Sequence, residues 1–280
     1  MVTTRTRLAR GVSAARALGA RRAALEMAAL AAYGFALEAV AMTVFASHRY
    51  DASWRVAPLG VPLAVAGVWA AVIVAAMAVA WRYGAASPVA RAATAALTGI
   101  TLDIMIEPVA ARTGLWAWTP PGPWLGVPIG NFVGWAVIVG AYAWGAERWA
   151  GAHGGARAIV HRLALAAACI AALVTVGLAW TRLGLEQAFA HERGWIVWGV
   201  VLVATVSSRW WPYGRPGSLP PSLPEQLAAT PGRGPQAVLL VVGFAFLLGA
   251  NRVGDEQLMV VAAASLLALQ AVAGVRRAGP

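Results

Sequence analysis

The chain has 280 residues, of which 60% are hydrophobic and 12% charged, and its mean hydropathy is +0.68. This composition excludes an ordinary soluble domain and is typical of a polytopic membrane protein. All 22 basic residues are arginines, so the chain lacks the lysine that a retinal Schiff base, a Walker site or pyridoxal phosphate requires. Its single cysteine, Cys169, excludes an internal disulfide and a cysteine-based metal site.

The apolar runs along the chain predict its helices, since a helix needs roughly 20 apolar residues to cross the hydrocarbon core of a bilayer. We expect an all-α polytopic membrane helix bundle with about eight transmembrane helices, or seven because the sixth and seventh runs are short. We expect one integral membrane domain over residues 1–280. The predicted helices are 23–45, 61–81, 88–111, 129–149, 158–180, 194–208, 236–250 and 257–275.

The arginines are distributed unevenly between the two sides of this predicted bundle. With the N-terminus inside, 16 of the 22 fall in cytoplasmic segments, in agreement with the positive-inside rule. Residues 1–22 then form a basic cytoplasmic arm, and the Pro-rich residues 209–235 form a flexible cytoplasmic loop. The arginines therefore indicate topology in a bacterial inner membrane, and we expect no nucleic-acid partner.

A weak internal repeat relates helices 1 and 2 to helices 3 and 4. The stretches "LGVPLAVAGVWAAVIV" at 59–74 and "LGVPIGNFVGWAVIVG" at 125–140 align without gaps. Upstream, "GFALE" resembles "GITLD" one residue out of the same register. Duplicated membrane units of this kind place sites at the interface between the copies. The equated positions include Pro62 with Pro128, Trp69 with Trp135, and Glu38 with Asp103.

Two carboxylates lie in the middle of the third predicted helix. Asp103 and Glu107 are four residues apart and therefore share one helical face. Pro108 follows, and its missing N–H leaves the carbonyl of Ile104 without a helical partner. These features predict a polar region inside the membrane.

Residues of two other helices reach the same depth. Glu38 lies at the level of Asp103, and Asn131 approaches that level from the outer end of the fourth helix. We therefore predict that these side chains and Glu107 converge on one pocket. Insertion of one ionised acid at a helix centre costs roughly 2.5–3.5 kcal/mol, and burial with mutual repulsion favours a neutral acid beside an ionised one. Such a pair suits proton donation. The alternative is a structural role, with hydrogen bonds between helices and Glu107 reaching toward Arg112.

Tryptophans surround this level. Trp116, Trp118 and Trp124 lie in the loop at the outer face, and Trp135 lies one turn inside the fourth helix. An interfacial aromatic belt is the alternative interpretation. Beside an acid, however, indole faces stabilise positive charge, so the combination is suited to the protonation of an alkene.

Metal and cofactor motifs are missing from the sequence. The four histidines are scattered among loops and helix ends, where we expect ordinary interfacial roles, and no aspartate-rich pair exists to hold Mg²⁺ and a diphosphate. We therefore expect no metal and no cofactor.

The segment "LDIMIEPVAARTGLWAW", followed by "GVPIGNFVGW", resembles the core of a family of membrane carotenoid-biosynthesis proteins. That core reads D-x-x-x-(E/D)-P-x-A, then G-x-W-x-W, then G-V-P-x-x-N-F-x-G-W, and it belongs to the cofactor-free carotenoid hydratases called CruF, which act on γ-carotene or bisanhydrobacterioruberin. The resemblance covers about residues 99–135, and the helix with Glu38 also fits. The Pro-rich loop after Trp211 and the weakly hydrophobic sixth helix depart from the family pattern.

The resemblance implies a carotenoid 1,2-hydratase, which adds water to the terminal C1–C2 double bond of a linear ψ end group and forms a tertiary alcohol. A neutral acid, in first place Asp103, would protonate the alkene, and indole rings would stabilise the cation. Water held by Glu38, Glu107 and Asn131 would attack. The implied partners are the bilayer, a linear carotenoid such as lycopene, and other enzymes of carotenoid biosynthesis.

Three other functions remain open at this point. A lycopene-type cyclase would form the same cation and capture it with an internal double bond. A proton-coupled transporter would carry acids along a path through both leaflets, whereas the later predicted helices carry none in their centres. A non-catalytic subunit would hold a carotenoid assembly together.

Overall fold

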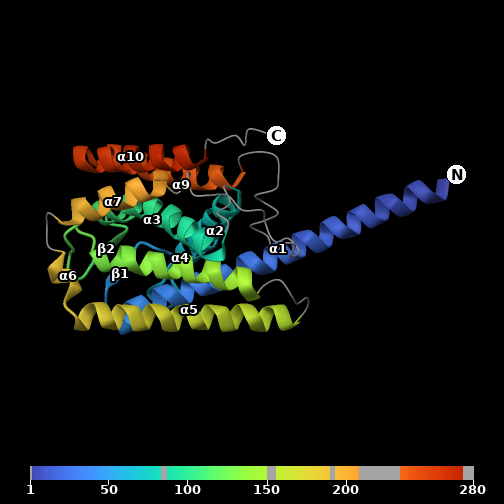
Figure 1. Cartoon of the computed structure of the whole chain (residues 1–280), viewed down its shortest axis with the longest axis horizontal. Helices are drawn as coiled ribbons and strands as arrows, with labels where there is room; N and C mark the ends of the chain where they lie inside the picture. Colours follow the sequence, from blue (N-terminus) through green and yellow to red (C-terminus); the bar gives the residue numbers. More distant parts are fainter. Residues whose placement is uncertain (1, 83–86, 150–155, 190–192, 208–233, 274–280) are drawn as a thin grey trace.

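The computed structural model describes residues 2–82, 87–149, 156–189, 193–207 and 234–273, and these form a helical bundle (Figure 1). The predicted all-α membrane bundle is confirmed. The structure adds two short strands, β1 (His48–Tyr50) and β2 (Trp116–Trp118), and a 3-10 turn, η1 (Pro58–Gly60). The helices are α1 (Val2–Val44), α2 (Leu63–Arg82), α3 (Pro88–Arg112), α4 (Ile129–Trp149), α5 (Ala156–Arg182), α6 (Leu185–Ala188), α7 (Arg193–Ser207), α9 (Gly234–Val253) and α10 (Glu256–Ala273).

Five of the described helices are long and apolar enough to cross a membrane, and they coincide with the first five predicted spans. The three later predictions also correspond to helices, but these are shorter. α7 has 15 residues, which at about 1.5 Å per residue gives roughly 22 Å against a hydrocarbon core of about 30 Å. α9 and α10 contain the apolar stretches Ala237–Val253 and Glu256–Ala271.

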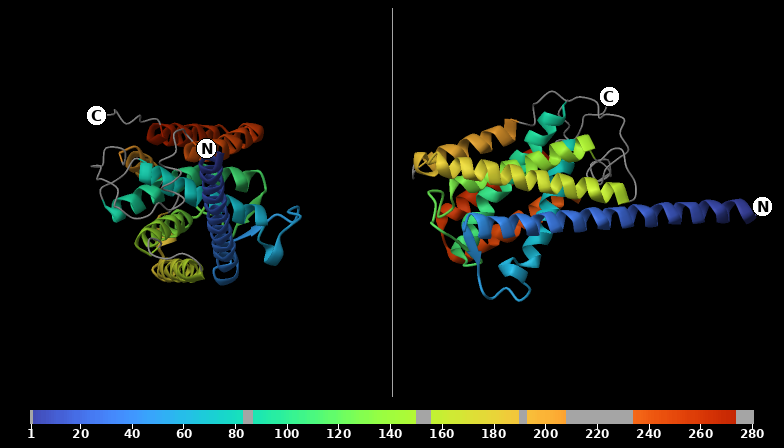
Figure 2. Two further views of the ribbon diagram at one scale, coloured as in Figure 1. Left: turned by 90° about the vertical axis from the view of Figure 1, so that its right-hand side faces the viewer. Right: turned by 90° about the horizontal axis from the view of Figure 1, so that it is seen from below.

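The first helix begins earlier than predicted. α1 starts at Val2 instead of residue 23, and its N-terminal part projects beyond the bundle (Figures 1 and 2). The reason is local, because the alanines, arginines and leucines of the predicted arm are strong helix formers. The predicted loop at 209–235 lies outside the described residues, except for Gly234 and Pro235, which begin α9.

The central position in the bundle belongs to α3. Ser87 caps its N-terminus by accepting a hydrogen bond from the Ala90 N–H (3.2 Å), and Pro88 occupies its first turn. Within the spans, 72% of α3 is buried but only 11% of α5. α5 lies on the outside of the bundle, on the side away from α10 (Figure 1). The acids of α3 are therefore interior groups.

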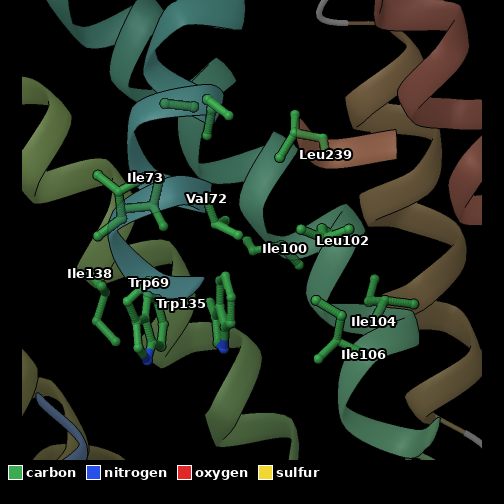
Figure 3. Packing of buried hydrophobic residues seen from close by; sticks show 14 of the residues in the cluster. Trp69, Val72, Ile73, Ile100, Leu102, Ile104, Ile106, Trp135, Ile138 and Leu239 are labelled. Carbon is green, nitrogen blue, oxygen red and sulfur yellow. The ribbon is translucent and has the colours of Figure 1, made fainter. Parts of the chain in front are cut away.

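The two halves of the predicted repeat meet at their equivalent tryptophans. Trp69 of α2 and Trp135 of α4 pack against each other at a tilt of 31°, with ring centroids 4.2 Å apart. Figure 3 shows the two rings side by side. Gly34, in "GFALE", packs against Trp69, and Gly99, in "GITLD", packs against Trp135 and Val139. The matching contacts agree with the predicted duplication.

Gly34 provides a test of this packing. A Cβ atom at Gly34 would lie 2.5 Å from the Cβ of Trp69, so we expect Gly34→Ala to destabilise the protein by about 1–3 kcal/mol. Gly67→Ala on α2 is the control, because a Cβ there meets no atom within 4 Å. Thermal unfolding in detergent measures both variants, and equal midpoints would contradict the predicted clash.

Candidate active site

Four aromatic rings share one face of the small β-sheet, which lies at the end of the bundle opposite the N-terminus (Figure 1). β1 and β2 are antiparallel, with His48 opposite Trp118 and Tyr50 opposite Trp116. Residues two apart in a strand point to the same side. The His48 and Trp118 rings are accordingly 5.1 Å apart, and the Tyr50 and Trp116 rings 5.7 Å.

Glu38 of α1 is held by three side chains from two elements, α2 and β1. Trp69 Nε1 donates to Glu38 Oε1 (2.6 Å), and His48 Nε2 pairs with Glu38 Oε2 (3.0 Å). The Tyr50 hydroxyl interacts with the same carboxylate. Glu38 is 8% exposed, so these partners replace the water that a buried carboxylate loses.

The Glu38–His48 pair favours the charged form of the imidazole. Burial lowers the pKa of His48, but the hydrogen bond and negative charge of Glu38, with a further contribution from Glu107, outweigh burial and raise this pKa above its ordinary value. His48 Nδ1 lies 2.9 Å from Ser47 Oγ. Burial also raises the pKa of Tyr50, which keeps its hydroxyl neutral.

Glu107 of α3 faces the second strand. Trp116 Nε1 and Trp118 Nε1 both donate to Glu107 Oε2, at 2.7 and 3.0 Å. Since both donors use the same oxygen, Oε1 is left for a proton or for a ligand. The β1–β2 pairing thus places the His48 imidazole beside Glu38 and the two indoles beside Glu107.

A cavity of about 490 Å³ joins these groups, within the usual size range of small-molecule sites. Its remaining walls are largely apolar and come from α1, α4 and α5. Val44 and Leu178 line it and are 53% and 38% exposed, so the cavity reaches the surface between α1 and α5. Six of the predicted site residues line it: Glu38, Glu107, Asn131, Trp116, Trp118 and Trp135.

Asp103 lies behind this cavity instead of in its wall. Its side chain is fully buried, and its Oδ2 accepts a hydrogen bond from Asn131 Nδ2 (2.8 Å). Its Oδ1 has no hydrogen-bond partner. Asn131 does line the cavity. Asp103 also interacts directly with the Glu107 side chain, so it reaches the cavity through Asn131 and Glu107, and the acid of α3 that lines the open space is Glu107.

Trp124 is also absent from the cavity wall. It is 1% exposed, and its Nε1 donates to the carbonyl of Ile104 (3.2 Å), the group that Pro108 leaves without a helical partner. Its ring packs against Trp195 and Trp198 of α7. Trp124 thus compensates for the break in the α3 hydrogen bonds and ties α3 to α7.

Trp124→Phe separates these two contributions. The ring contacts remain, but the Ile104 carbonyl loses its donor, and a buried unsatisfied carbonyl costs about 1–3 kcal/mol. We expect a lower thermal unfolding midpoint in detergent. Trp144→Phe, at a site that is 42% exposed, is the control, and an equal loss in both variants would contradict the role given to Trp124.

The structure adds three cavity residues that the sequence did not reveal: His48, Tyr50 and Trp69. The expectation of an ordinary interfacial role is wrong for His48, because strand pairing brings it to Glu38. His153 and His191 lie outside the described residues. The alternation His48-x-Tyr50 and Trp116-x-Trp118 was the available signal. Arg112 does not reach Glu107 but pairs with Asp255, the residue before α10 (3.4 Å).

Among the residues that the structure describes, no group of three or more histidine, cysteine, aspartate or glutamate side chains could hold a metal ion. The cavity therefore offers carboxyl, imidazole, phenol, amide and indole groups. Together they can donate and accept protons and can stabilise a cation over an aromatic face.

Comparison with known proteins assigns the chain to a family. A family model described as "Carotenoid biosynthesis protein" matches residues 2–204, a range that contains all the cavity residues named above. No curated protein and no solved structure matches the chain. Since the match covers well over half of its length, the chain belongs to the carotenoid biosynthesis protein family.

Proposed function

We propose that the chain is a carotenoid 1,2-hydratase of the CruF type. The proposed reaction adds water to the C1–C2 double bond of a linear ψ end group and forms a tertiary alcohol. The observation that carries the proposal is the cavity itself, in which two carboxyl groups and several indole rings meet between apolar walls that reach the surface at Val44 and Leu178. That surface opening would let the end group of a carotenoid enter from the lipid.

The first step of the proposed mechanism is proton donation from Glu107 to C2. With Oε2 accepting two indole N–H groups, Oε1 is the oxygen suited to carry the proton. The C1=C2 π electrons form the new C–H bond, and C1 becomes a tertiary cation. The faces of Trp116, Trp118 and Trp135 would stabilise this cation.

The second step is the capture of the cation by water. The water oxygen forms the C–O bond at C1, and its surplus proton passes to the Glu38 carboxylate. His48 and Tyr50 hold that carboxylate in place. Proton return from Glu38 to Glu107 through water restores both groups, so the net reaction consumes only water and alkene.

Asp103 keeps a role in this proposal as a positioning residue. It accepts a hydrogen bond from the Asn131 NH₂ group, and this bond fixes the orientation of an amide that lines the cavity. A carbonyl oxygen there can accept a hydrogen bond from the attacking water. The sequence predicted Asp103 as the proton donor. In this proposal Asp103 instead acts indirectly, by positioning Asn131.

Expression in a bacterium that makes lycopene or γ-carotene tests the function. A pigment heavier by one water supports hydration. An isomer of unchanged mass supports cyclisation, in which an internal double bond captures the same cation. Unchanged pigment, with the protein present in the membrane, contradicts both reactions and favours the transporter or assembly functions.

A further inference from the structure

Exposed polar residues line the cavity in addition to the exposed apolar residues Val44 and Leu178. Thr119, Thr181 and Gln187 line the cavity and are also exposed. They lie where β2, α5 and α6 end, at the same end of the bundle as the sheet (Figure 1). In the predicted orientation this is the outer face of the membrane. We call these three residues the polar rim.

The carboxylate of Glu186 beside this rim is already occupied. Its two oxygens accept hydrogen bonds from the backbone N–H groups of Ile129 (2.8 Å) and Gly130 (2.9 Å), and Trp180 Nε1 donates to it as well (3.0 Å). Glu186 therefore caps the N-terminus of α4, where a negative charge is stabilising. This leaves Thr181 and Gln187 as the rim groups best suited to bind a mobile polar molecule.

From this geometry, we propose that the polar rim is the entry site through which water reaches the cavity, separately from the carotenoid. The inference rests on the proposed hydration. Each turnover consumes one water molecule, and the exposed apolar side chains of Val44 and Leu178 offer water no hydrogen bond. The Thr181 hydroxyl donates to the Gly177 carbonyl (3.0 Å) and keeps an acceptor lone pair, and the Gln187 amide offers a donor and an acceptor.

Separate entry has a chemical consequence. A cation that meets water is hydrated, whereas a cation in a dry cavity loses a proton again or is captured by an internal double bond. The rim therefore acts on the choice of product and not on the protonation step. Residues of the rim should determine how much hydrated carotenoid forms relative to water-free products.

The test uses membranes that contain the full chain, lycopene in detergent and a D₂O buffer. The double variant Thr181→Val with Gln187→Leu removes the polar groups of two rim residues. We expect hydrated product to fall about tenfold, the effect of losing roughly one hydrogen bond in the capture step. Water-free products should rise, namely cyclised isomers and recovered lycopene, both of which carry deuterium delivered to the alkene by the exchanged acid.

The matched control is Thr175→Val with Gln257→Leu. Thr175 lies on the same helix and makes the same kind of bond, to the Ala171 carbonyl (2.8 Å), but neither control residue lines the cavity. Unchanged hydration in the rim variant overturns the inference. A parallel loss of hydrated and water-free products also overturns it, because general damage lowers both. A native chain without hydrated product overturns the proposed function, and this inference with it.

Discussion

Glu107→Gln should lower hydrated carotenoid by at least about 100-fold in lycopene-producing cells, the usual scale of a general acid. Glutamine keeps an oxygen for the two indole N–H groups but has no proton to donate to the alkene. The variant should therefore enter the membrane normally and leave lycopene unchanged. Mass analysis of the pigments, with immunodetection of the protein in membranes, measures the effect.

Two further variants identify the cause of this loss. Glu107→Asp keeps a carboxyl group on a side chain that is shorter by one methylene, so it should retain part of the activity that Glu107→Gln loses. Glu256→Gln, at an exposed site on α10, should leave the pigment pattern unchanged. Full activity of Glu107→Gln would show that another group donates the proton.

Glu38→Gln should be nearly as damaging. An amide cannot accept the proton of the attacking water, and it does not hold a charged His48. We expect a loss of about 100-fold in hydrated product. Glu26→Gln is the matched control, because Glu26 lies on the same helix but does not line the cavity. Equal activity of the two variants would contradict the proton-accepting role.

The same substitution should change the dependence of stability on pH. Burial lowers the pKa of His48, but Glu38 outweighs burial and raises it above its ordinary value of about 6.5. A raised pKa adds stability that is complete below the unfolded-state value and is lost as pH rises through the folded-state value. The thermal midpoint of the native chain should therefore fall as pH rises above about 6.5.

In Glu38→Gln this component should be absent, because the partner that raises the pKa of His48 is gone. Other titrating groups act on both proteins, so the difference between their two pH profiles isolates the pair. Parallel profiles would mean that the pair adds no pH-dependent stability.

The sequence predicted the parts of this molecule that depend on local composition. The lengths of the apolar runs predicted the helix bounds to within a few residues, apart from the start of α1. They could do so because a membrane span must satisfy its backbone N–H and C=O groups with hydrogen bonds of its own. Depth along the helices predicted that Glu38, Asp103, Glu107 and Asn131 converge, and the structure brings all of them except Asp103 into the wall of one cavity. α1 begins about twenty residues before its predicted start because the arginine-rich segment there also favours a helix.

The details that were not predicted depend on the direction in which each helical side chain points and on contacts between residues far apart in the sequence. Residues four apart on a helix differ by about 40° in direction, and this difference puts Glu107 in the cavity wall and Asp103 behind Asn131. His48 meets Trp118 only through a strand pair whose members lie about seventy residues apart. The orphan carbonyl of Ile104 was predictable, but its donor, Trp124, comes from a loop whose path the sequence does not specify.

The pairing of β1 with β2 bears on how the predicted repeat could have arisen. β1 lies between the two helices of the first copy of the predicted repeat and β2 between those of the second, so their pairing closes the chamber across the two copies. A half-length ancestor would have completed such a chamber only as a homodimer with two identical acids. Fusion of two such halves would have let each specialise: in this chain the first half places His48 beside its acid, and the second carries Glu107 where the first copy has Met42.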